Sequence, residues 1–511
     1  MNFAPSFSVP NKKWLKWVTV AVLVFLNLIR QVPTFIIAGS MKKLKEEFGA
    51  TNAMMGMIYT AYIVSFMVFS PLFGYLGDRY SRRTIMAVGV LIWSVATLAG
   101  SFVDPKTENR SLQWGSPSYL LFLFSRAFVG IGQASFQTIA PTVISDMFVK
   151  TERSRILALY FFALPVGSGF GFTLASYLGS WQWGLRLASI FGGIIVLCIF
   201  FLTIDPPRGD ILDIGDKDED RSYRQDLLVL IKNKSYVLLT LAFTCVRLSV
   251  VAFSWYGTLY LTYGYFSIDE ENRIMKRIED VKFVFGVLVM MSGVVGVPLG
   301  MVISTSLTTR YPRADPLICG VATLVSSAFL GFSLLVGDIN IVACLTFIFF
   351  ATLAVNMNWS VLADMVLYIF VPSRRATATA VQTFVASAFG DAGVTYLLGL
   401  ISDALFKYFM TINNVCRDPR DVDVYSYFPF EDFQEDVLNQ DEDCVQKVTL
   451  LFKSMQWTLF IPVVIQIIGA GFFFITAVYI VNDKVPDDET DGKAQIKDLI
   501  LIKRESDNES E

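Results

Sequence analysis

Apolar runs of about 20 residues recur along the whole chain, and they most constrain its fold. Each run is long enough to cross a hydrocarbon core of roughly 30 Å as a helix. Because 54% of the 511 residues are hydrophobic and only 17% are charged, the apolar surface exceeds what a soluble core of ordinary proportions hides. The sequence therefore predicts an all-α membrane protein with about twelve transmembrane helices, near 15–39, 54–76, 84–103, 118–144, 156–178, 184–204, 235–263, 282–306, 316–337, 340–370, 376–409 and 456–482.

The predicted spans fall into two groups of six. Residues 205–234 interrupt the apolar pattern with a charged connection that begins with two prolines. The two groups also repeat one another: SDMFVKTERSR (145–155) leads into FFALPVGSGFG (161–171), and ADMVLYIFVPSRR (363–375) leads into FVASAFGDAG (384–393). Two related six-helix halves around a central pathway resemble the parallel-repeat pattern of the major facilitator transporters.

The charged segments predict the boundaries and the orientation of the chain. We expect a tail at 1–13, an N-terminal half at 14–204, a linker at 205–234, a C-terminal half at 235–482 with an outward loop at 410–455, and a tail at 483–511. Short connections rich in arginine mark the cytoplasmic side; they read GDRYSRR (77–83), KTERSR (150–155), TTRYPR (308–313) and PSRR (372–375). Both tails are then cytoplasmic, and the first span is a retained helix rather than a signal peptide.

Two features of the predicted outward side fit an oxidising lumen or cell exterior. Cys416 and Cys444 lie in the acidic outward loop, where a disulfide would tie down a long segment; two free thiols are the alternative. Asn109 begins an Asn-Arg-Ser acceptor sequence for glycosylation in the loop at 104–117. The other four cysteines fall within apolar spans, where we expect them to serve packing.

The composition excludes several classes of chemistry. The chain contains no histidine, which rules out Ser-His-Asp and Cys-His catalysis and removes the usual ligand of transition metals. We expect no enzyme activity, no cofactor and no metal. The net charge of −3 gives no indication of nucleic acid. A membrane-embedded monomer is the expected state.

Arginine within the apolar spans is the strongest indication of a binding site. Arg30, Arg126 and Arg247 each fall inside a span, and an intramembrane charge is costly unless it faces a cavity or an acid. No acidic residue lies between Ser118 and Ser145, so Arg126 has no partner on its own helix. A guanidinium offers two parallel donors to phosphate oxygens. The candidate substrate-binding residues are Arg126, Gln133, Arg247, Phe136, Trp255, Tyr256 and Trp359, although lipid-facing or core packing is the alternative for each aromatic.

A gate is predicted at the link between the second and third spans, GYLGDRYSRR (74–83). Here the chain resembles the best-known signature of the major facilitator family, a glycine, an aspartate and several arginines in a tight turn. Asp78 could pair with basic groups or with a helix N-terminus of the other half, and release them when the halves rock. The arginines could instead serve as a topology signal only. The candidate gating residues are Gly74, Asp78, Arg79, Arg82, Arg83 and Asp146.

Longer segments in both halves resemble the spinster family of lipid transporters. They include FGYLGDRYSRR (73–83), FVGIGQASFQTIAPTVISDMF (128–148), FFALPVGSGFGF (161–172), DPPRG (205–209), PRADPL (312–317), MNWSVLADMVLYIFVPSRRATA (357–378) and GDAGVTYLLGLISD (390–403). The resemblance implies a major facilitator fold that moves lysophospholipids or sphingoid phosphates, with proton coupling in several members. It also implies a late endosomal or lysosomal membrane, with the plasma membrane as the alternative.

Two departures from the spinster pattern bear on energy coupling. Gln133 stands where the family carries a glutamate in the fourth helix, and the first span, FLNLIRQVPTFIIAGS (25–40), lacks the family's aspartate. Glutamine keeps the hydrogen-bonding shape but does not titrate, so uniport is expected. Asp364 and Asp391 remain the candidate proton-coupling sites, with helix packing or gating as their alternative role. A carrier of a small polar anion or sugar, and a non-transporting lipid sensor, are the alternative functions.

Overall fold

The computed structural model describes residues 12–103, 116–148, 150–205, 223–267, 278–308, 310–370, 372–413 and 442–483. Every regular element in these ranges is a helix. Together the helices form twelve segments that are long and apolar enough to cross a membrane, as the sequence predicted. Cys416 and Asn109, with the predicted disulfide and glycosylation site, lie outside the described residues, as do most of the linker and both tails.

The N-terminal half contains eight helices, which are α1 (Lys12–Ile29), α2 (Gln31–Gly39), α3 (Met41–Phe48), α4 (Asn52–Arg79), α5 (Arg82–Gly100), α6 (Pro117–Met147), α7 (Lys150–Tyr177) and α8 (Trp181–Leu202). The first predicted span is broken at Arg30 into α1 and α2. Pro33 explains the break, because proline has no N–H to donate to the carbonyl of Ile29. The short α3 lies between the first two predicted spans, and Met41, Leu44 and Phe48 form its buried face.

The C-terminal half contains α9 (Tyr223–Lys232), α10 (Lys234–Ser267), α11 (Ile278–Thr308), α12 (Ala314–Val336), α13 (Ile341–Asn356), α14 (Asn358–Ile369), α15 (Pro372–Ala386), the π-helical segment η3 (Ser387–Asp391), α16 (Val394–Ile412) and α18 (Glu442–Asp483). The eleventh span is broken after η3, where Gly393 has φ +82°, a conformation that favours glycine.

The predicted outward loop at 410–455 is too long. α16 continues to Ile412, and α18 begins at Glu442. The error has a physical reason, since charged residues lower the mean hydropathy of 442–455 although Val448, Phe452 and Met455 are buried against the C-terminal half. The predicted linker at 205–234 contains the short helix α9, and the seventh span begins at Lys234.

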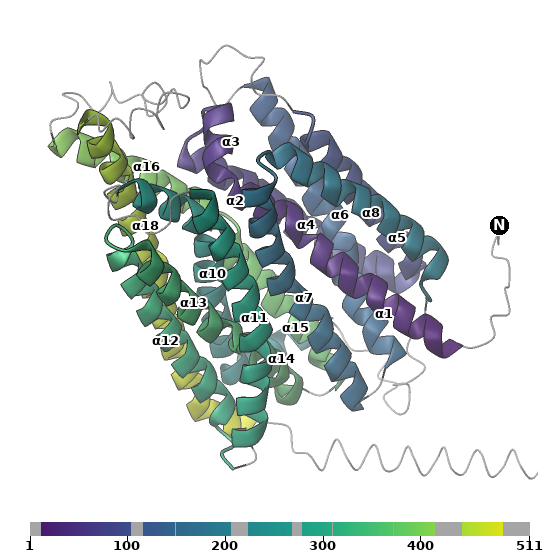
Figure 1. The fold of residues 1–511 in the computed structure, drawn as a ribbon. Coiled ribbons are helices and arrows are strands. Elements are labelled where there is room, and N and C mark those ends of the chain that lie inside the picture. Colours follow the sequence, from purple (N-terminus) through teal and green to yellow (C-terminus); the bar gives the residue numbers. More distant parts are fainter. Residues whose placement is uncertain are drawn as a thin grey trace, which may run out of the picture.

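The two halves stand side by side, the purple-to-blue half on one side of Figure 1 and the green-to-yellow half on the other. We name the ends of the bundle after two helix starts: α4 begins at the Asn52 end, and α5 begins at the Arg82 end. The halves meet where α7 packs on α11 and α4 packs on α16. Glycines permit this approach, since a Cβ at Gly56 would lie 2.3 Å from the Thr395 carbonyl oxygen.

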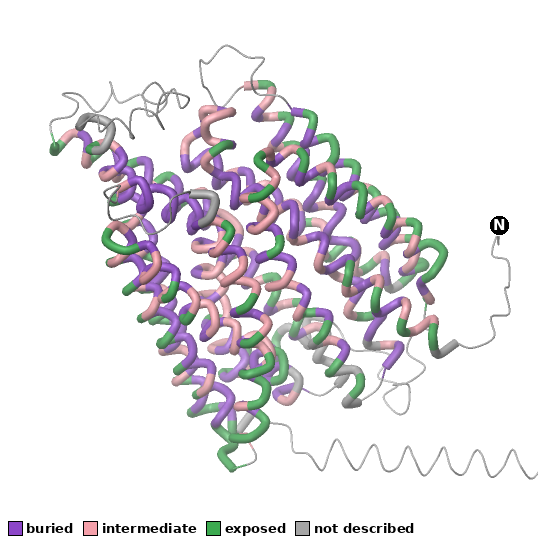
Figure 2. The backbone as a smooth tube through the Cα atoms, viewed as in Figure 1, coloured by how far each residue is buried: buried purple, intermediate pink, exposed green. Residues whose placement is uncertain are grey.

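Apolar side chains cover the outer faces of the bundle. Figure 2 shows exposed residues along the outermost helices of both halves and buried residues between them. Phe201 on α8 is 73% exposed and Val302 on α11 is 59% exposed. Large apolar side chains exposed in this number are typical of a surface covered by lipid tails, which agrees with the predicted membrane spans.

The glycines of α7 provide a test of the packing between halves. A Cβ at Gly169 would lie 2.5 Å from the Met290 Cβ and 2.7 Å from the Gly286 carbonyl oxygen. We expect Gly169→Ala to lower the free energy of unfolding by about 1–3 kcal/mol, because the backbones must separate. Gly193→Ala on α8 is the matched control, since nothing lies within 4 Å of its Cβ position. Equal thermal unfolding midpoints for the two variants would contradict this packing.

Candidate functional site

An ion pair between α10 and η3 lies in the C-terminal half. Arg247 donates from Nε to Asp391 Oδ1 at 3.1 Å, and its Nη2 donates to Asp391 Oδ2. Asp391 is fully buried and also accepts from Ser387 Oγ at 3.4 Å. A Cβ at Gly390 would lie 3.2 Å from the Arg247 Cβ, so the glycine lets η3 approach α10 closely. The structure thus joins two residues that the sequence assigned to different roles.

Arg30 lies at the break between α1 and α2 and is 5% exposed. Its Nε donates to Asn27 Oδ1 at 2.6 Å and its Nη1 to Gln31 Oε1 at 3.0 Å, while Asn27 Nδ2 donates to the Tyr160 carbonyl oxygen at 2.6 Å. No carboxylate in the described part of the chain pairs with Arg30. Arg30 and Arg247 lie within electrostatic reach of each other across the two halves, and Tyr59 and Tyr62 lie within reach of both.

Arg126 is the least satisfied of the three arginines. It is 4% exposed, and its Nη2 is buried with no hydrogen-bond partner among the described residues. Its Nε reaches Ser125 Oγ at 3.4 Å, and the guanidinium lies 5.1 Å from the centre of the Phe122 ring. Gly100 leaves the room that the guanidinium occupies, since a Cβ there would lie 2.7 Å from Nη2.

A small cavity joins Arg126 to the other half. Its volume is about 10 Å³, which is room for about one water molecule. The lining residues come from α2, α4 and α6 of the N-terminal half and from α10 of the C-terminal half; they are Thr34, Ile37, Ile58, Tyr59, Tyr62, Arg126, Val129 and Trp255. Arg126 therefore forms part of the wall of a small space between the two halves.

A second cavity has a different character. It measures about 460 Å³ and lies between α11, α12, α13 and the residues around Met357. Its lining is apolar apart from Tyr311, and Leu317 and Val321 in that lining are exposed on the outer face. Such a groove suits bilayer lipid tails, whereas the Arg126 cavity presents a charge.

Gln133 lies two helical turns beyond Arg126 on α6 and is fully buried. Its Nε2 donates to Gln137 Oε1 at 3.1 Å, and its Oε1 has no partner among the described residues. The amide thus stays inside the N-terminal half as an uncharged polar group.

The four candidate aromatics separate into different environments. Phe136 is fully buried and packs on Trp93 within the N-terminal half. Trp255 lies 5.0 Å from Tyr59 between ring centres and lines the Arg126 cavity. Trp359 packs on Phe243, and its ring centre lies 5.9 Å from the Arg247 guanidinium.

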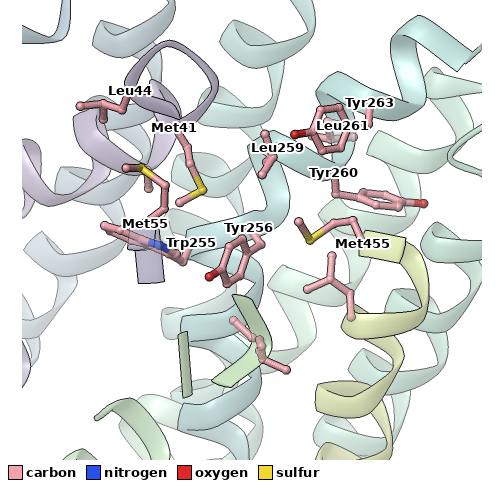
Figure 3. Packing of buried hydrophobic residues seen from close by; sticks show 14 of the residues in the cluster. Met41, Leu44, Met55, Trp255, Tyr256, Leu259, Tyr260, Leu261, Tyr263 and Met455 are labelled. Carbon is pink, nitrogen blue, oxygen red and sulfur yellow. The ribbon is translucent and has the colours of Figure 1, made fainter. Parts of the chain in front are cut away.

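Tyr256, the fourth candidate aromatic, belongs to the buried contact between the halves. Its hydroxyl donates to the Thr395 carbonyl oxygen at 2.6 Å and also lies 3.0 Å from the Asn52 carbonyl oxygen. Figure 3 shows Tyr256 and Trp255 of α10 in one buried cluster with Met41 and Met55 of the N-terminal half.

The candidate gating residues at the Arg82 end contact their own half. Arg82 forms an ion pair with Asp146, which joins α5 to α6. The guanidinium group of Arg79 lies 4.2 Å from the centre of the Tyr75 ring, and that of Arg83 lies 5.7 Å from the centre of the Phe200 ring. Gly74 faces the Thr138 methyl group, since a Cβ on the glycine would lie 3.7 Å from it. Asp78 lies in the last turn of α4, and its side chain is outside the described part of the structure.

Asp364 and Asp391, the candidate proton-coupling residues, differ in environment. Asp391 is buried in its pair with Arg247, whereas Asp364 on α14 is exposed. Among the described residues, Cys198, Cys245, Cys319 and Cys344 are free thiols, and no group of three or more metal-ligating side chains occurs. The side chain of Cys444 is not described.

Sequence reasoning missed a polar contact between the halves at the Asn52 end. Asp403 on α16 accepts hydrogen bonds from the backbone N–H groups of Asn52 at 3.2 Å and Ala53 at 3.0 Å. Thr258 Oγ1 donates to the Ala38 carbonyl oxygen at 2.6 Å. The sequence placed Asp403 inside the predicted span at 376–409 and gave no indication that a helix start of the other half lies beside it.

Comparison with known proteins identifies the family. The profile of the Major Facilitator Superfamily matches residues 23–393. Protein spinster of Drosophila melanogaster is 38% identical over 490 residues, covering 92% of this chain and 78% of that protein. Protein spinster homolog 1 of Homo sapiens is 37% identical over 416 residues, covering 78% of this chain and 77% of that protein. The chain belongs to the spinster family.

Solved structures agree with this assignment at the level of the fold. A bacterial homologue of the human lysosomal transporter spinster, in an inward-facing and unoccupied conformation, superposes with a TM-score of 0.76 at 16% identity, covering 93% of this chain and all of that one. A D-xylose–proton symporter gives 0.61 at 14% identity over 90% of this chain and 97% of that one. Spinster and other major facilitator proteins are transporters, not enzymes, and this chain is a multi-pass membrane transporter of that kind.

The spinster chain's Arg247–Asp391 pair yields a stability prediction. We expect Asp391→Asn to lower the free energy of unfolding by about 1.5–3 kcal/mol, because it leaves the partly buried Arg247 guanidinium without its counterion. The double variant Arg247→Gln with Asp391→Asn should recover most of this loss, because no charge is then left unpaired. Thermal unfolding of the purified protein measures both.

Asp364→Asn is the matched control for this prediction, because it removes the same charge from an exposed position. Its unfolding midpoint should stay close to that of the native chain. An Asp391→Asn variant as stable as Asp364→Asn would show that the Arg247–Asp391 pair has no structural role.

Proposed function

We propose that this spinster protein transports an anionic amphiphilic lipid, such as a lysophospholipid or a sphingoid phosphate, by alternating access. The observation that carries the proposal is the Arg126 guanidinium, whose Nη2 is buried without a partner beside a cavity that both halves enclose. A phosphate head group supplies the oxygens that such a donor lacks. A site between two halves is also the site that rocking exposes to each side in turn.

The charges around the centre of the bundle favour an anion over a neutral sugar. Arg247 is paired with Asp391, whereas neither Arg30 nor Arg126 has a carboxylate partner among the described residues. Two guanidinium groups therefore remain without a carboxylate. Tyr59, Tyr62 and Trp255 supply an apolar lining beside Arg126 for the part of a lipid that follows the head group.

The hydrogen bonds that join the halves cluster toward the Asn52 end. With the arginine-rich connections on the cytoplasmic side, this arrangement corresponds to a state closed to the outside. Both tails are then cytoplasmic. The family relation favours a late endosomal or lysosomal membrane, with the plasma membrane as the alternative, and the chain acts as a monomer.

Arg126→Ala tests the head-group site. We expect it to abolish uptake of the labelled anionic lipid into proteoliposomes while the protein stays folded. Loss of one charged hydrogen-bond donor costs about 1.5–3 kcal/mol, or about 10- to 100-fold in rate. Arg186→Ala is the matched control, because Arg186 lies over the Phe102 and Trp183 rings within the N-terminal half. Retained transport in Arg126→Ala would remove Arg126 from the site.

The same proteoliposomes test the substrate class. Protein that moves no labelled lysophospholipid and no sphingoid phosphate, under any gradient, would contradict lipid transport. Uptake of a small polar anion or a sugar under those conditions would establish the alternative carrier.

Energy coupling is tested by the response to a pH gradient. We propose uniport driven by the substrate gradient, because Gln133 does not titrate and Asp391 is held by Arg247. Transport by the native chain should therefore change by less than about twofold when a gradient of one pH unit is imposed. Gln133→Glu should increase this dependence, and Gln137→Glu one turn away serves as control. Strong dependence in the native chain would contradict uniport.

A further inference from the structure

The N-terminus of α4 is capped by a carboxylate from the opposite half. The first N–H groups of a helix have no acceptor within the helix. Thr51 Oγ1 accepts from the Met54 N–H at 2.9 Å, whereas the N–H groups of Asn52 and Ala53 donate to the two oxygens of Asp403. Asp403 lies on α16, 350 and 351 positions away from these donors. A negative charge at this position also interacts favourably with the helix dipole.

Neighbouring side chains tighten the same contact. Asn52 Nδ2 donates to Ser402 Oγ at 3.2 Å, and Asn52 Oδ1 accepts from Lys45 Nζ at 2.7 Å. Lys45 also reaches the Tyr263 hydroxyl at 3.3 Å. Residues of α3, α4, α10 and α16 therefore meet around Asn52.

Close backbone packing places Asp403 within reach of α4. A Cβ at Gly399 would lie 2.4 Å from the Asn52 carbonyl oxygen. Thr395, one turn earlier, donates from Oγ1 to the Gly56 carbonyl oxygen at 3.0 Å. α4 and α16 thus touch along two turns, and the carboxylate of Asp403 ends this contact at the helix start.

Opening the Asn52 end would break all of these contacts together. The two N–H groups of α4, the Asp403 carboxylate and the Tyr256 hydroxyl would each need a water molecule instead. Because Asp403 is 9% exposed, its interaction with the helix start is screened less than a surface pair. The strength of this cap therefore sets how much of the protein is closed at this end.

We propose that Asp403 is the latch of the Asn52 gate: it holds the two halves closed by capping α4 and must release α4 in every transport cycle. This inference rests on the alternating-access part of the proposed function and does not depend on the identity of the lipid. Asp403 acts as a positioning residue, since it contacts the helix and not the Arg126 cavity.

Hydrogen–deuterium exchange of the full-length protein, without lipid substrate, tests the latch. Asp403→Asn removes the charge and one strong acceptor. We expect exchange about tenfold faster not only at residues 52–58 but also at 256–263 and 395–402, because the gate opens as a unit. Asp338→Asn is the matched control, a neutralised carboxylate at the same end whose electrostatic neighbours Tyr260 and Cys344 lie in its own half.

Four results would overturn the latch. Faster exchange confined to the first turn of α4 would mean that Asp403 only caps that helix, and unchanged exchange would mean that it does neither. The same change in Asp338→Asn would indicate a general effect of charge. Asp403→Glu keeps the carboxylate and should exchange as the native chain does; if it folds while Asp403→Asn does not, the carboxylate serves folding rather than the gate.

The assay separates this inference from the proposed lipid function. Coordinated faster exchange supports the latch even when the liposomes show no lipid uptake. Unchanged exchange in a chain that transports lipid rejects the latch and leaves the transport function standing.

Discussion

The cost of a charge within the hydrocarbon core decides how the centre of this spinster protein is arranged. Two hydrogen bonds to Asp391 offset this cost for Arg247. For Arg30 the side-chain oxygens of Asn27 and Gln31 offset it, and for Arg126 the Phe122 ring does so in part. Of the three arginine charges, only that of Arg247 is neutralised by a carboxylate of the described structure. Arg126, the least neutralised, is also the one that lines a cavity between the halves.

The breaks in the first and eleventh spans lie where these charges are held. Arg30 occupies the break between α1 and α2, and Asp391 is the last residue of η3, two positions before Gly393. In broken helices, neighbouring groups must satisfy the freed backbone, so irregular backbone is tolerated in a membrane only inside the protein or at a cavity. The same breaks therefore position the charged side chains and confine them to the interior. The two halves are related by a parallel repeat, yet their charged residues differ: the C-terminal half holds the Arg247–Asp391 ion pair, whereas Arg30 and Arg126 of the N-terminal half have no carboxylate partner among the described residues.

The sequence predicted the fold well because lipid exposure imposes a long, uninterrupted pattern. The twelve spans, the bipartite division and the family were read correctly from apolar runs and motifs. The helix α3 and the start of α18 were not predicted, because their charged residues lower the mean hydropathy although one face of each is buried, as Met41 and Leu44 are in α3. The partner of Arg247 was not predicted because 144 positions separate it from Asp391. The contact of Asp403 with the start of α4 depends on which helices are neighbours in space, and a hydropathy pattern carries no information on that.

Two antiparallel helices, α4 and the eleventh span, connect the ends of the bundle. α4 begins at the Asn52 end, where Asp403 of α16 caps it, and its last turn carries Asp78 at the Arg82 end. The eleventh span runs the other way, so α15 begins at the Arg82 end. Each helix thus carries a carboxylate at the end where the other begins. A rigid α4 cannot hold both ends against its neighbour while the halves rock, because closing one end separates the other.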